Sequence, residues 1–182
     1  MTTLRTFILS AVAASLLSAG TAFANPMVGG APMYESKNIV ENAVNSKDHT
    51  TLVAAVKAAG LVDTLMSAGP FTVFAPVNAA FTKLPAGTVD TLLKPENKSK
   101  LTSVLTYHVV AGKLSAEDLK QKIEAGNGKA QLTTVEGETL EVLMKGRSLE
   151  IKDSKGDIAK ITIADVNQSN GVIHVIDTVL LP

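Results

Sequence analysis

The sequence predicts an α+β domain with helices in its first half and most of its strands in its second half. Up to Gly126 most apolar residues recur every three or four positions, as on the buried face of a helix. From Asn127 the apolar period changes to two, which is typical of strands with one buried face. The later strand segments are joined by hairpin-length links, so we expect mainly antiparallel pairing. The 182 residues contain no internal repeat, which favours one such domain.

The first 24 residues match the pattern of a secretory signal peptide. Arg5 precedes a short apolar stretch, Thr6–Gly20, and Ala22 and Ala24 form an A-x-A cleavage site. A transmembrane anchor is the alternative, but the apolar stretch is shorter than the roughly 20 residues that cross a bilayer. We therefore expect cleavage after Ala24 and a mature protein in the periplasm or outside the cell. No other long apolar run occurs, so no transmembrane segment is expected in the mature chain.

The composition of the mature chain excludes several classes of protein. Without Arg5 it carries 16 basic and 17 acidic residues, which argues against nucleic-acid binding because that depends on neutralising phosphates. The absence of Cys excludes a disulfide scaffold, a thiol catalyst and a thiolate zinc site. Stability must therefore come from a hydrophobic core, which a chain of about 150 residues can supply.

Local periodicity gives the expected order of elements. Residues 25–37 contain two Pro and two Gly and are expected to form a flexible arm. Helices are expected over residues 39–44, 51–59, 61–66, 78–81, 88–93, 95–105 and 116–125. Strands are expected over residues 71–75, 107–110, 130–134, 140–144, 149–151, 158–164 and 172–181. The pair Asn170-Gly171 predicts a tight turn before the last strand.

Capping residues mark the expected starts of three helices. Thr50 or Thr51 can cap the helix that follows it, and Asn78 can cap the short helix that it opens. Ser115 and Asp118 have the spacing of a capping box.

Three histidines are the main candidates for chemistry, and none lies in a catalytic or metal-binding motif. His49 lies in a polar loop and is expected to be exposed. His108 and His174 each lie in a predicted strand between apolar residues, where a hydrogen-bonded structural role is commoner than a ligand role. Neither has the H-x-x-x-H or H-x-H spacing of a metal site, so no metal and no cofactor are expected. The chain also lacks a G-x-S-x-G element, a P-loop and a dinucleotide fingerprint, so enzyme activity is not expected.

Three segments together resemble the signatures of the fasciclin (FAS1) domain family. They are Phe71–Phe81 (FTVFAPVNAAF), Leu105–Leu114 (LTYHVVAGKL) and Asn170–Pro182, which begins NGVIHVID. The helix before them, Thr51–Leu61, fits the same family. The resemblance covers about residues 38–182, and the order and spacing of the segments make it specific. One departure is Val77, where the family often has Thr.

The resemblance implies a fold and the residues that hold it together. The implied fold is a FAS1-like β-wedge of two mainly antiparallel sheets covered by several α-helices, in one domain over residues 38–182. The residues implied as structural are Phe74, Pro76, Asn78, Phe81, Gly171 and His174. His108 matches the family's motif histidine, which braces the fold through buried hydrogen bonds. The chain is similar to small secreted bacterial proteins with a single fasciclin domain.

The resemblance also implies a function, namely adhesion or protein interaction without catalysis. The implied partner is a cell-surface or extracellular-matrix protein or glycan. In animal members of the family, the Tyr-His region and a segment before the closing signature are linked to integrin binding. The corresponding candidates for partner contact are Tyr107, His108, Asp165 and Val166.

Two other functions remain open on the sequence. A periplasmic protein that binds a small hydrophobic ligand or cofactor would need a sizeable apolar pocket between the sheet and the helices. Met66 and Met144 could line such a pocket, although Met at such positions is more often core filler. An enzyme would need a nucleophile and a base within hydrogen-bond reach. An adhesion module would instead present an exposed apolar or Tyr-bearing patch.

Overall fold

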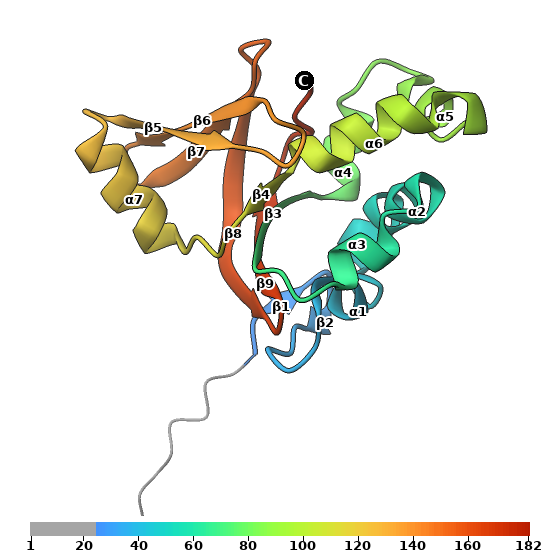
Figure 1. The fold of residues 1–182 in the computed structure, drawn as a ribbon, viewed down its shortest axis with the longest axis horizontal. Coiled ribbons are helices and arrows are strands. Elements are labelled where there is room, and N and C mark those ends of the chain that lie inside the picture. The colour runs from blue at the N-terminus through green and yellow to red at the C-terminus, as the bar shows by residue number, and fades with distance from the viewer. Residues whose placement is uncertain (1–24) are drawn as a thin grey trace, which may run out of the picture.

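The structure is a computed structural model that describes residues 25–182 (Figure 1). The predicted signal peptide, residues 1–24, lies outside the described residues. The helices are α1 (Ile39–Ala43), η1 (Lys47–His49), α2 (Thr50–Ala59), α3 (Val62–Met66), α4 (Asn78–Thr82), α5 (Thr88–Leu92), η2 (Pro95–Asn97), α6 (Lys98–Tyr107) and α7 (Ala116–Ala125), η1 and η2 being 3-10 helices. The strands are β1 (Met27–Val28), β2 (Ala31–Pro32), β3 (Phe71–Pro76), β4 (Val109–Ala111), β5 (Lys129–Thr133), β6 (Thr139–Lys145), β7 (Ser148–Lys152), β8 (Ile158–Gln168) and β9 (Gly171–Ile176). Within residues 25–182, none of these helices has the length and apolarity that a bilayer span requires.

Seven strands form one sheet in the order β4-β3-β9-β8-β7-β6-β5, and β1 and β2 form a separate two-stranded sheet. In the larger sheet β3 and β9 run parallel, whereas the other neighbouring strands run antiparallel. The predicted α+β class with mainly antiparallel pairing is therefore confirmed. The one parallel pair joins strands that are far apart in the sequence, as a parallel pair requires.

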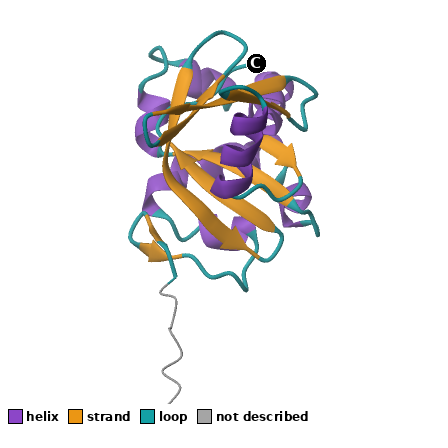
Figure 2. Cartoon of the chain, turned by 90° about the vertical axis from the view of Figure 1, so that its left-hand side faces the viewer, coloured by secondary structure: helices purple, strands orange, loops and turns teal. Residues whose placement is uncertain are grey.

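Strand β8 belongs to both halves of this sheet. Its residues 158–160 pair with β7, and its residues 161–168 pair with β9. Register shifts after Ile161 and after Ile163 mark irregularities of the bulge type, which bend and twist a strand. The two sheets expected for the wedge are thus two halves of one sheet that turns at β8, and Figure 2 shows these halves at an angle to each other. A bridge between Val110 and Thr134 brings the outer ends of the two halves together.

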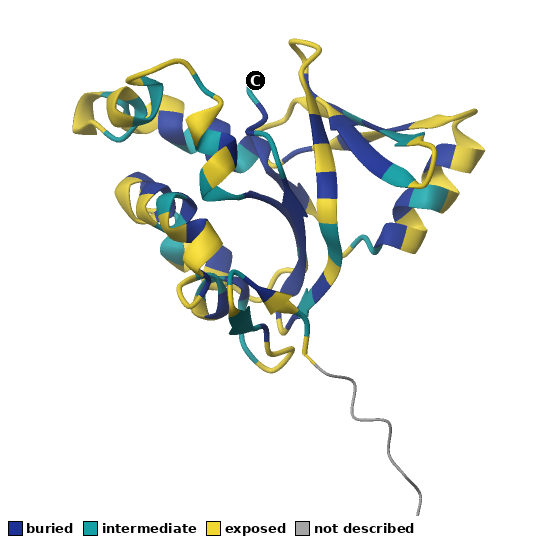
Figure 3. Cartoon of the chain, turned by 180° about the vertical axis from the view of Figure 1, so that it is seen from behind, coloured by how far each residue is buried: buried dark blue, intermediate teal, exposed yellow. Residues whose placement is uncertain are grey.

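The helices divide between the two halves of the sheet (Figure 1). Helix α7 packs against β5 and β6, whereas α1, α2 and α3 lie together beside β3 and β9. Each group covers its own hydrophobic cluster. Strand β3 serves both clusters, because Val73 and Ala75 face the first and Phe74 faces the second. Strands β3 and β9 are consequently buried on both faces, as Figure 3 shows in dark blue.

Residues 25–37 differ from the predicted flexible arm. They form the β1–β2 pair, and the Met33 N–H donates to the Pro26 carbonyl at 2.9 Å. Val28 and Met33 are 4% and 2% exposed and belong to the first hydrophobic cluster. The prediction of a flexible arm is wrong. It was based on the Pro and Gly residues of this segment, whereas the side chains of Val28 and Met33 reach the core and hold the segment in place.

Two of the three capping predictions need correction. The capping box of Ser115 and Asp118 is present at α7 and is confirmed. Helix α2 begins at Thr50 without a cap from its own chain segment; instead Asn78 Oδ1 accepts a hydrogen bond from the Thr51 N–H at 3.0 Å. The N-cap position of α4 is Val77, so Asn78 caps α2 rather than its own helix.

Two strand boundaries also differ from the prediction. Tyr107 was expected in a strand but is the last residue of α6, and His108 follows it as the helix C-cap. The final strand ends at Ile176, and the chain then continues without regular structure to Pro182. Val179 and Leu180 are nevertheless buried, which explains the apolar pattern that predicted a longer strand.

Candidate functional site

The four predicted contact residues lie in different environments. Tyr107 and Val166 are 0% exposed and His108 is 3% exposed, so these three offer a partner almost no surface. Asp165 is exposed. The structure therefore argues against direct contact through Tyr107, His108 or Val166 and leaves Asp165 as the accessible candidate.

Tyr107 ties the end of α6 to the other half of the sheet. Its hydroxyl accepts a hydrogen bond from the Ser154 N–H at 3.0 Å and donates to the Thr139 carbonyl at 3.4 Å. Burial raises the pKa of the Tyr107 phenol, although the hydrogen bond from Ser154 opposes this effect. The phenol is therefore a neutral internal connector.

His108 is a buried side chain that holds the C-terminal segment after β9 in place. Its Nδ1 lies 2.7 Å from the Val104 carbonyl, and its Nε2 accepts the Leu180 N–H at 3.0 Å. These partners place the ring proton on Nδ1, because Nε2 has to accept. Burial lowers the pKa of His108 to about 4, so the ring is neutral at physiological pH. Both ring nitrogens are occupied and neither is free for a metal or a substrate.

His174 and Asp165 form a bracket between β8, β9 and the start of α7. The Asp165 N–H donates to His174 Nδ1 at 3.2 Å, and His174 Nε2 donates to the Leu114 carbonyl at 2.8 Å. Asp165 Oδ1 accepts the Ala116 N–H at 2.7 Å, at the first turn of α7. Asp165 has φ +57°, a left-handed conformation that is uncommon outside Gly and Asn. The exposed Asp165 carboxylate is therefore held rigidly at the irregular part of β8.

His49 is buried, not exposed as the sequence predicted. It is 3% exposed; Nδ1 lies 2.9 Å from Ser46 Oγ, and Nε2 lies 3.4 Å from the Ala75 carbonyl. Burial lowers the pKa of His49. The polar residues around it in the sequence gave no sign that the ring faces β3.

The six residues implied as structural occupy varied positions. Phe74 is fully buried and stacks on His174 with ring centroids 5.8 Å apart, whereas Phe81 is half-buried. Pro76 is the last residue of β3. Gly171 lies so close to the Phe71 carbonyl oxygen that any Cβ would collide with it.

Asn170 is a buried connector that the sequence analysis missed. Its Oδ1 accepts the Ile39 N–H at 3.0 Å, and its Nδ2 donates to the carbonyls of Leu65 and Ser67 at 2.7 and 2.8 Å. One side chain thus joins the β8–β9 turn to the start of α1 and the end of α3. The Asn-Gly pair predicted a turn, and nothing near it in the sequence indicates these distant partners.

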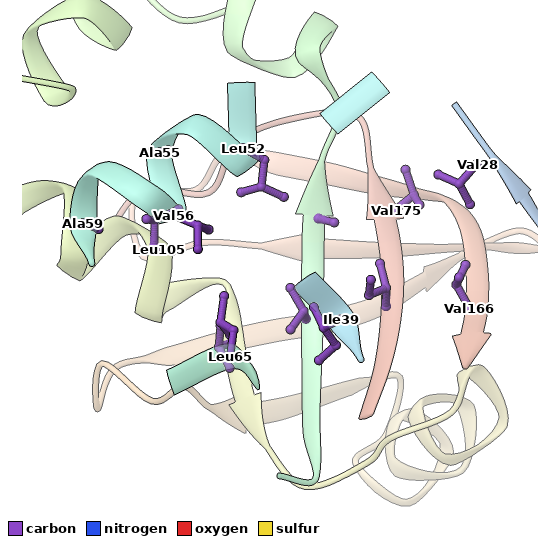
Figure 4. Close-up of a cluster of buried hydrophobic side chains, with 14 of the residues drawn as sticks. Val28, Ile39, Leu52, Ala55, Val56, Ala59, Leu65, Leu105, Val166 and Val175 are labelled. Atoms are coloured by element: carbon purple, nitrogen blue, oxygen red, sulfur yellow. The ribbon is translucent and has the colours of Figure 1, made fainter. Parts of the chain in front are cut away.

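An apolar cavity lies between helices α1–α3 and the sheet. Its volume is about 70 Å³. Figure 4 shows part of its wall, with Leu65 and Leu105 toward one side, Val28 and Val166 toward the other, and Ile39 between them. The wall is almost entirely carbon. Met66 and Met144, the two methionines considered for such a pocket, are not among its lining residues.

The polar groups in the cavity wall are mostly engaged with the protein. Ser46 and His49 bond to each other, and both ring nitrogens of His108 have partners. Across residues 25–182, every fully buried side-chain nitrogen or oxygen has a hydrogen-bond partner. The same residues contain no cluster of three His, Asp or Glu side chains that would suit a metal ion. The wall of this cavity suits an apolar ligand. Its lining offers no nucleophile paired with a free base.

Comparison with known proteins gives consistent matches. The family model "Fasciclin domain" matches residues 47–182. The chain is 48% identical over 158 residues to Protein sll1483 of Synechocystis sp., covering 86% of this chain and 79% of that protein. It is 41% identical over 122 residues to the cell surface glycolipoprotein MPB83 of Mycobacterium bovis, covering 67% of this chain and 48% of that protein.

A solved structure shares the fold. It is a FAS1 domain pair from the insect cell adhesion molecule fasciclin I, with a TM-score of 0.56 and 24% identity. The match covers 71% of this chain and 43% of the insect chain.

Proposed function

This chain belongs to the fasciclin domain family, and from that premise we propose that it is an exported, non-catalytic module that binds a protein or glycan of a cell surface or extracellular matrix. The Mycobacterium bovis relative is described as a cell surface glycolipoprotein, and the insect protein with this fold as a cell adhesion molecule. The pattern of residues 1–24 supports export to the periplasm or the outside of the cell. The mature chain is near electrical neutrality, which supports a partner other than nucleic acid.

The observation that carries this proposal is that three polar motif residues hold the fold together, whereas a fourth, Asp165, is exposed. Tyr107, His108 and His174 bond to backbone groups of distant segments and so maintain the fold. Asp165 alone among the candidate contacts presents an exposed carboxylate, and it does so from a fixed backbone position. A rigid exposed charge is suited to recognition, because little conformational freedom is lost when a partner binds.

The test is attachment of protein-coated beads to cells and to matrix components. Asp165→Asn removes the charge but keeps the oxygen that accepts from Ala116 and tolerates the left-handed backbone. Asp90→Asn, at an exposed position on α5, is the matched control. We expect saturable attachment that Asp165→Asn weakens and Asp90→Asn preserves. Absence of attachment to every target would refute adhesion, and equal attachment by both variants would refute the role of Asp165.

The apolar cavity favours a second function, the binding of a small hydrophobic ligand. It lies between the sheet and the helices, where such a site was expected from the sequence, but at about 70 Å³ it is smaller than the sizeable pocket expected, so only a small apolar ligand fits it as it stands. The test is solvent extraction of the purified protein followed by mass spectrometry. An apolar compound bound in stoichiometric amount would support this function, and its absence together with failure to bind any added apolar probe would refute it.

A further inference from the structure

We propose that His174 is a pH switch that controls the position of the Asp165 carboxylate: when the His174 ring gains a proton, the carboxylate leaves the start of α7 and turns to the ring. This inference rests on the role proposed above for Asp165 in attachment, and it adds a regulation of that role, namely weaker attachment in acid surroundings. It is carried by a bulge opposite His174, by the directions of the two hydrogen bonds of the ring, and by the contact of Asp165 with α7.

Strand β8 has an irregular step opposite His174. Two residues of β8, Ala164 and Asp165, stand opposite the single residue His174 of β9. Two residues against one make a β-bulge, in which the ladder of backbone hydrogen bonds is interrupted. The Asp165 N–H donates to Nδ1 of the His174 ring instead, at 3.2 Å. The bulge is therefore held to β9 by a side chain that can titrate.

The two hydrogen bonds of the His174 ring require its neutral form. Nε2 lies 2.8 Å from the Leu114 carbonyl oxygen, which only accepts, so Nε2 carries the ring proton. Nδ1 faces the Asp165 N–H, which only donates, so Nδ1 is the acceptor. A second proton on Nδ1 would place two donors against each other. Protonation of the ring therefore breaks the bond that holds Asp165 to β9.

The other two histidines do not link a proton to an exposed group. The ring nitrogens of His49 lie beside a hydroxyl and a carbonyl oxygen, which can both accept, so a protonated His49 can keep both partners. His108 Nε2 accepts from the backbone of Leu180, which is buried, and burial lowers the pKa of His108 to about 4. Only the bond of His174 leads to a residue at the surface.

The Asp165 carboxylate is the charge that acts on the His174 ring. Burial lowers the pKa of the ring, whereas the bond to the Leu114 carbonyl and the Asp165 carboxylate oppose this effect. Phe74, which stacks on the ring, is uncharged, and β9 contains no charged residue. The charged side chains of the loop and helix beside the ring are exposed, where solvent screens them: Lys113, Glu117 and Asp118. A proton on Nδ1 is therefore attracted to Asp165.

Movement of this carboxylate changes the surface of the protein. With the ring neutral, Asp165 Oδ1 accepts the Ala116 N–H at 2.7 Å, and the residue is exposed. Turned to the ring, the carboxylate is paired with a positive charge and no longer accepts from Ala116. A partner that recognises the charge of Asp165 then loses its contact. We expect attachment to be about 3- to 10-fold weaker at about pH 5 than at about pH 7.5.

NMR of ¹⁵N-labelled protein expressed from the full chain tests the switch without any partner. At about pH 7.5 the His174 ring should carry its proton on Nε2 alone. As the pH falls to about 4.5, the amide signals of Asp165 and Ala116 should shift with the midpoint of the His174 ring. Signals of α2, which packs in the other hydrophobic cluster, should not follow that midpoint.

Three results of this titration would overturn the proposal. The first is a proton on Nδ1 at neutral pH. The second is a pair of Asp165 and Ala116 signals that do not follow the His174 ring. The third is loss of all folded signals at the midpoint of the ring, since unfolding would then replace a local movement.

Two variants of His174 separate the two bonds of the ring. His174→Asn places an amide oxygen where Nδ1 lies and so keeps an acceptor for the Asp165 N–H. His174→Gln places an amide nitrogen near Nε2 and so keeps a donor for the Leu114 carbonyl, but it loses the acceptor. Neither side chain titrates. In the bead assay the Asn variant should attach as the parent does at neutral pH, at both pH values, and the Gln variant should attach weakly at both.

The outcomes of the bead assay distinguish this proposal from the proposed function. A His174→Asn protein with the same pH dependence as the parent overturns the switch and leaves adhesion standing. No attachment of the parent at either pH refutes adhesion, and the NMR titration then decides on the switch alone. The titration of the parent also decides if the two variants fail to fold.

Discussion

Asn78 caps a helix that ends 19 residues before it in the sequence. Its Oδ1 accepts the Thr51 N–H at 3.0 Å, and its Nδ2 donates to the Lys47 carbonyl at 2.8 Å. The start of α4 is thereby fastened to the junction of η1 and α2. Helix α2 forms part of the cavity wall, so the same contact holds that wall in place.

Replacement of Asn78 tests this long-range cap. Asn78→Ala should lower the free energy of unfolding by about 1–2 kcal/mol, because it leaves the Thr51 N–H without its partner. Asn78→Asp keeps an acceptor oxygen and loses only the donation to Lys47, so its loss should be smaller. Urea unfolding of the three proteins measures the effect. Equal stability of Asn78→Ala and the parent would show that the cap contributes nothing.

Stability should fall as the pH drops from about 6.5 to about 4. His108 has a folded-state pKa of about 4 and an unfolded value near 6.5, so in this window the unfolded chain binds a proton that the folded chain excludes. The contribution is fully present above pH 6.5 and is lost through the window, for a total of roughly 3 kcal/mol. Burial lowers the pKa of His49 and of His174 as well, which adds in the same direction.

Unfolding free energies measured across this range check the prediction. His108→Gln should be less stable than the parent at pH 7, because the Leu180 N–H loses its partner, but should depend less on pH between 6.5 and 4. A pH dependence identical to that of the parent would contradict the assignment of this effect to His108.

The backbone of Asp165 predicts a graded series of substitutions. Asp165→Asn should be nearly neutral, because Asn tolerates a positive φ and keeps the oxygen that accepts from Ala116. Asp165→Ala should cost about 1–2 kcal/mol through strain and the lost hydrogen bond, and Asp165→Val more, because a β-branched residue fits this backbone poorly. Chemical denaturation gives the ranking, and a Val variant as stable as the Asn variant would contradict it.

Loss of the Asn170 side chain should loosen the helices that cover the cavity. Asn170→Ala leaves the buried Ile39 N–H and the Leu65 carbonyl without partners, at a cost of about 2–4 kcal/mol. Hydrogen exchange should accelerate in α1 and α3 more than in α7, which lies on the other half of the sheet. Gln131→Ala, at an exposed position on β5, is the control. Uniform acceleration in all helices would contradict a local clamp.

The fold was largely predictable because its signals are local. The change of apolar period near Asn127 marks the start of the strand-rich half, and the Ser115–Asp118 capping box marks the start of α7. The prediction was wrong where a boundary depends on tertiary packing. Tyr107 ends a helix because its side chain reaches across to the β7–β8 turn, and residues 25–37 are packed because Val28 and Met33 reach the first cluster.

The candidate site was less predictable, because exposure depends on the assembled fold. The motif residues Tyr107, His108 and Val166 were expected to contact a partner and are buried. The cavity could be stated as an expectation, but its lining could not, since Met66 and Met144 lie outside it. Asn170 carries three long-range hydrogen bonds, and its sequence neighbourhood predicted only a turn.

The sequence by itself determined the α+β class, the order of helices and strands, and the family to which the chain belongs. These features depend on periodicity, caps and short motifs, which act between residues a few positions apart. The tertiary structure alone decided which polar groups meet, as in the pairs Asn78–Thr51 and His174–Asp165, and where an apolar cavity remains between helices and sheet. Contacts between segments that are far apart in the sequence form only when the whole chain folds. A local sequence pattern therefore cannot predict them.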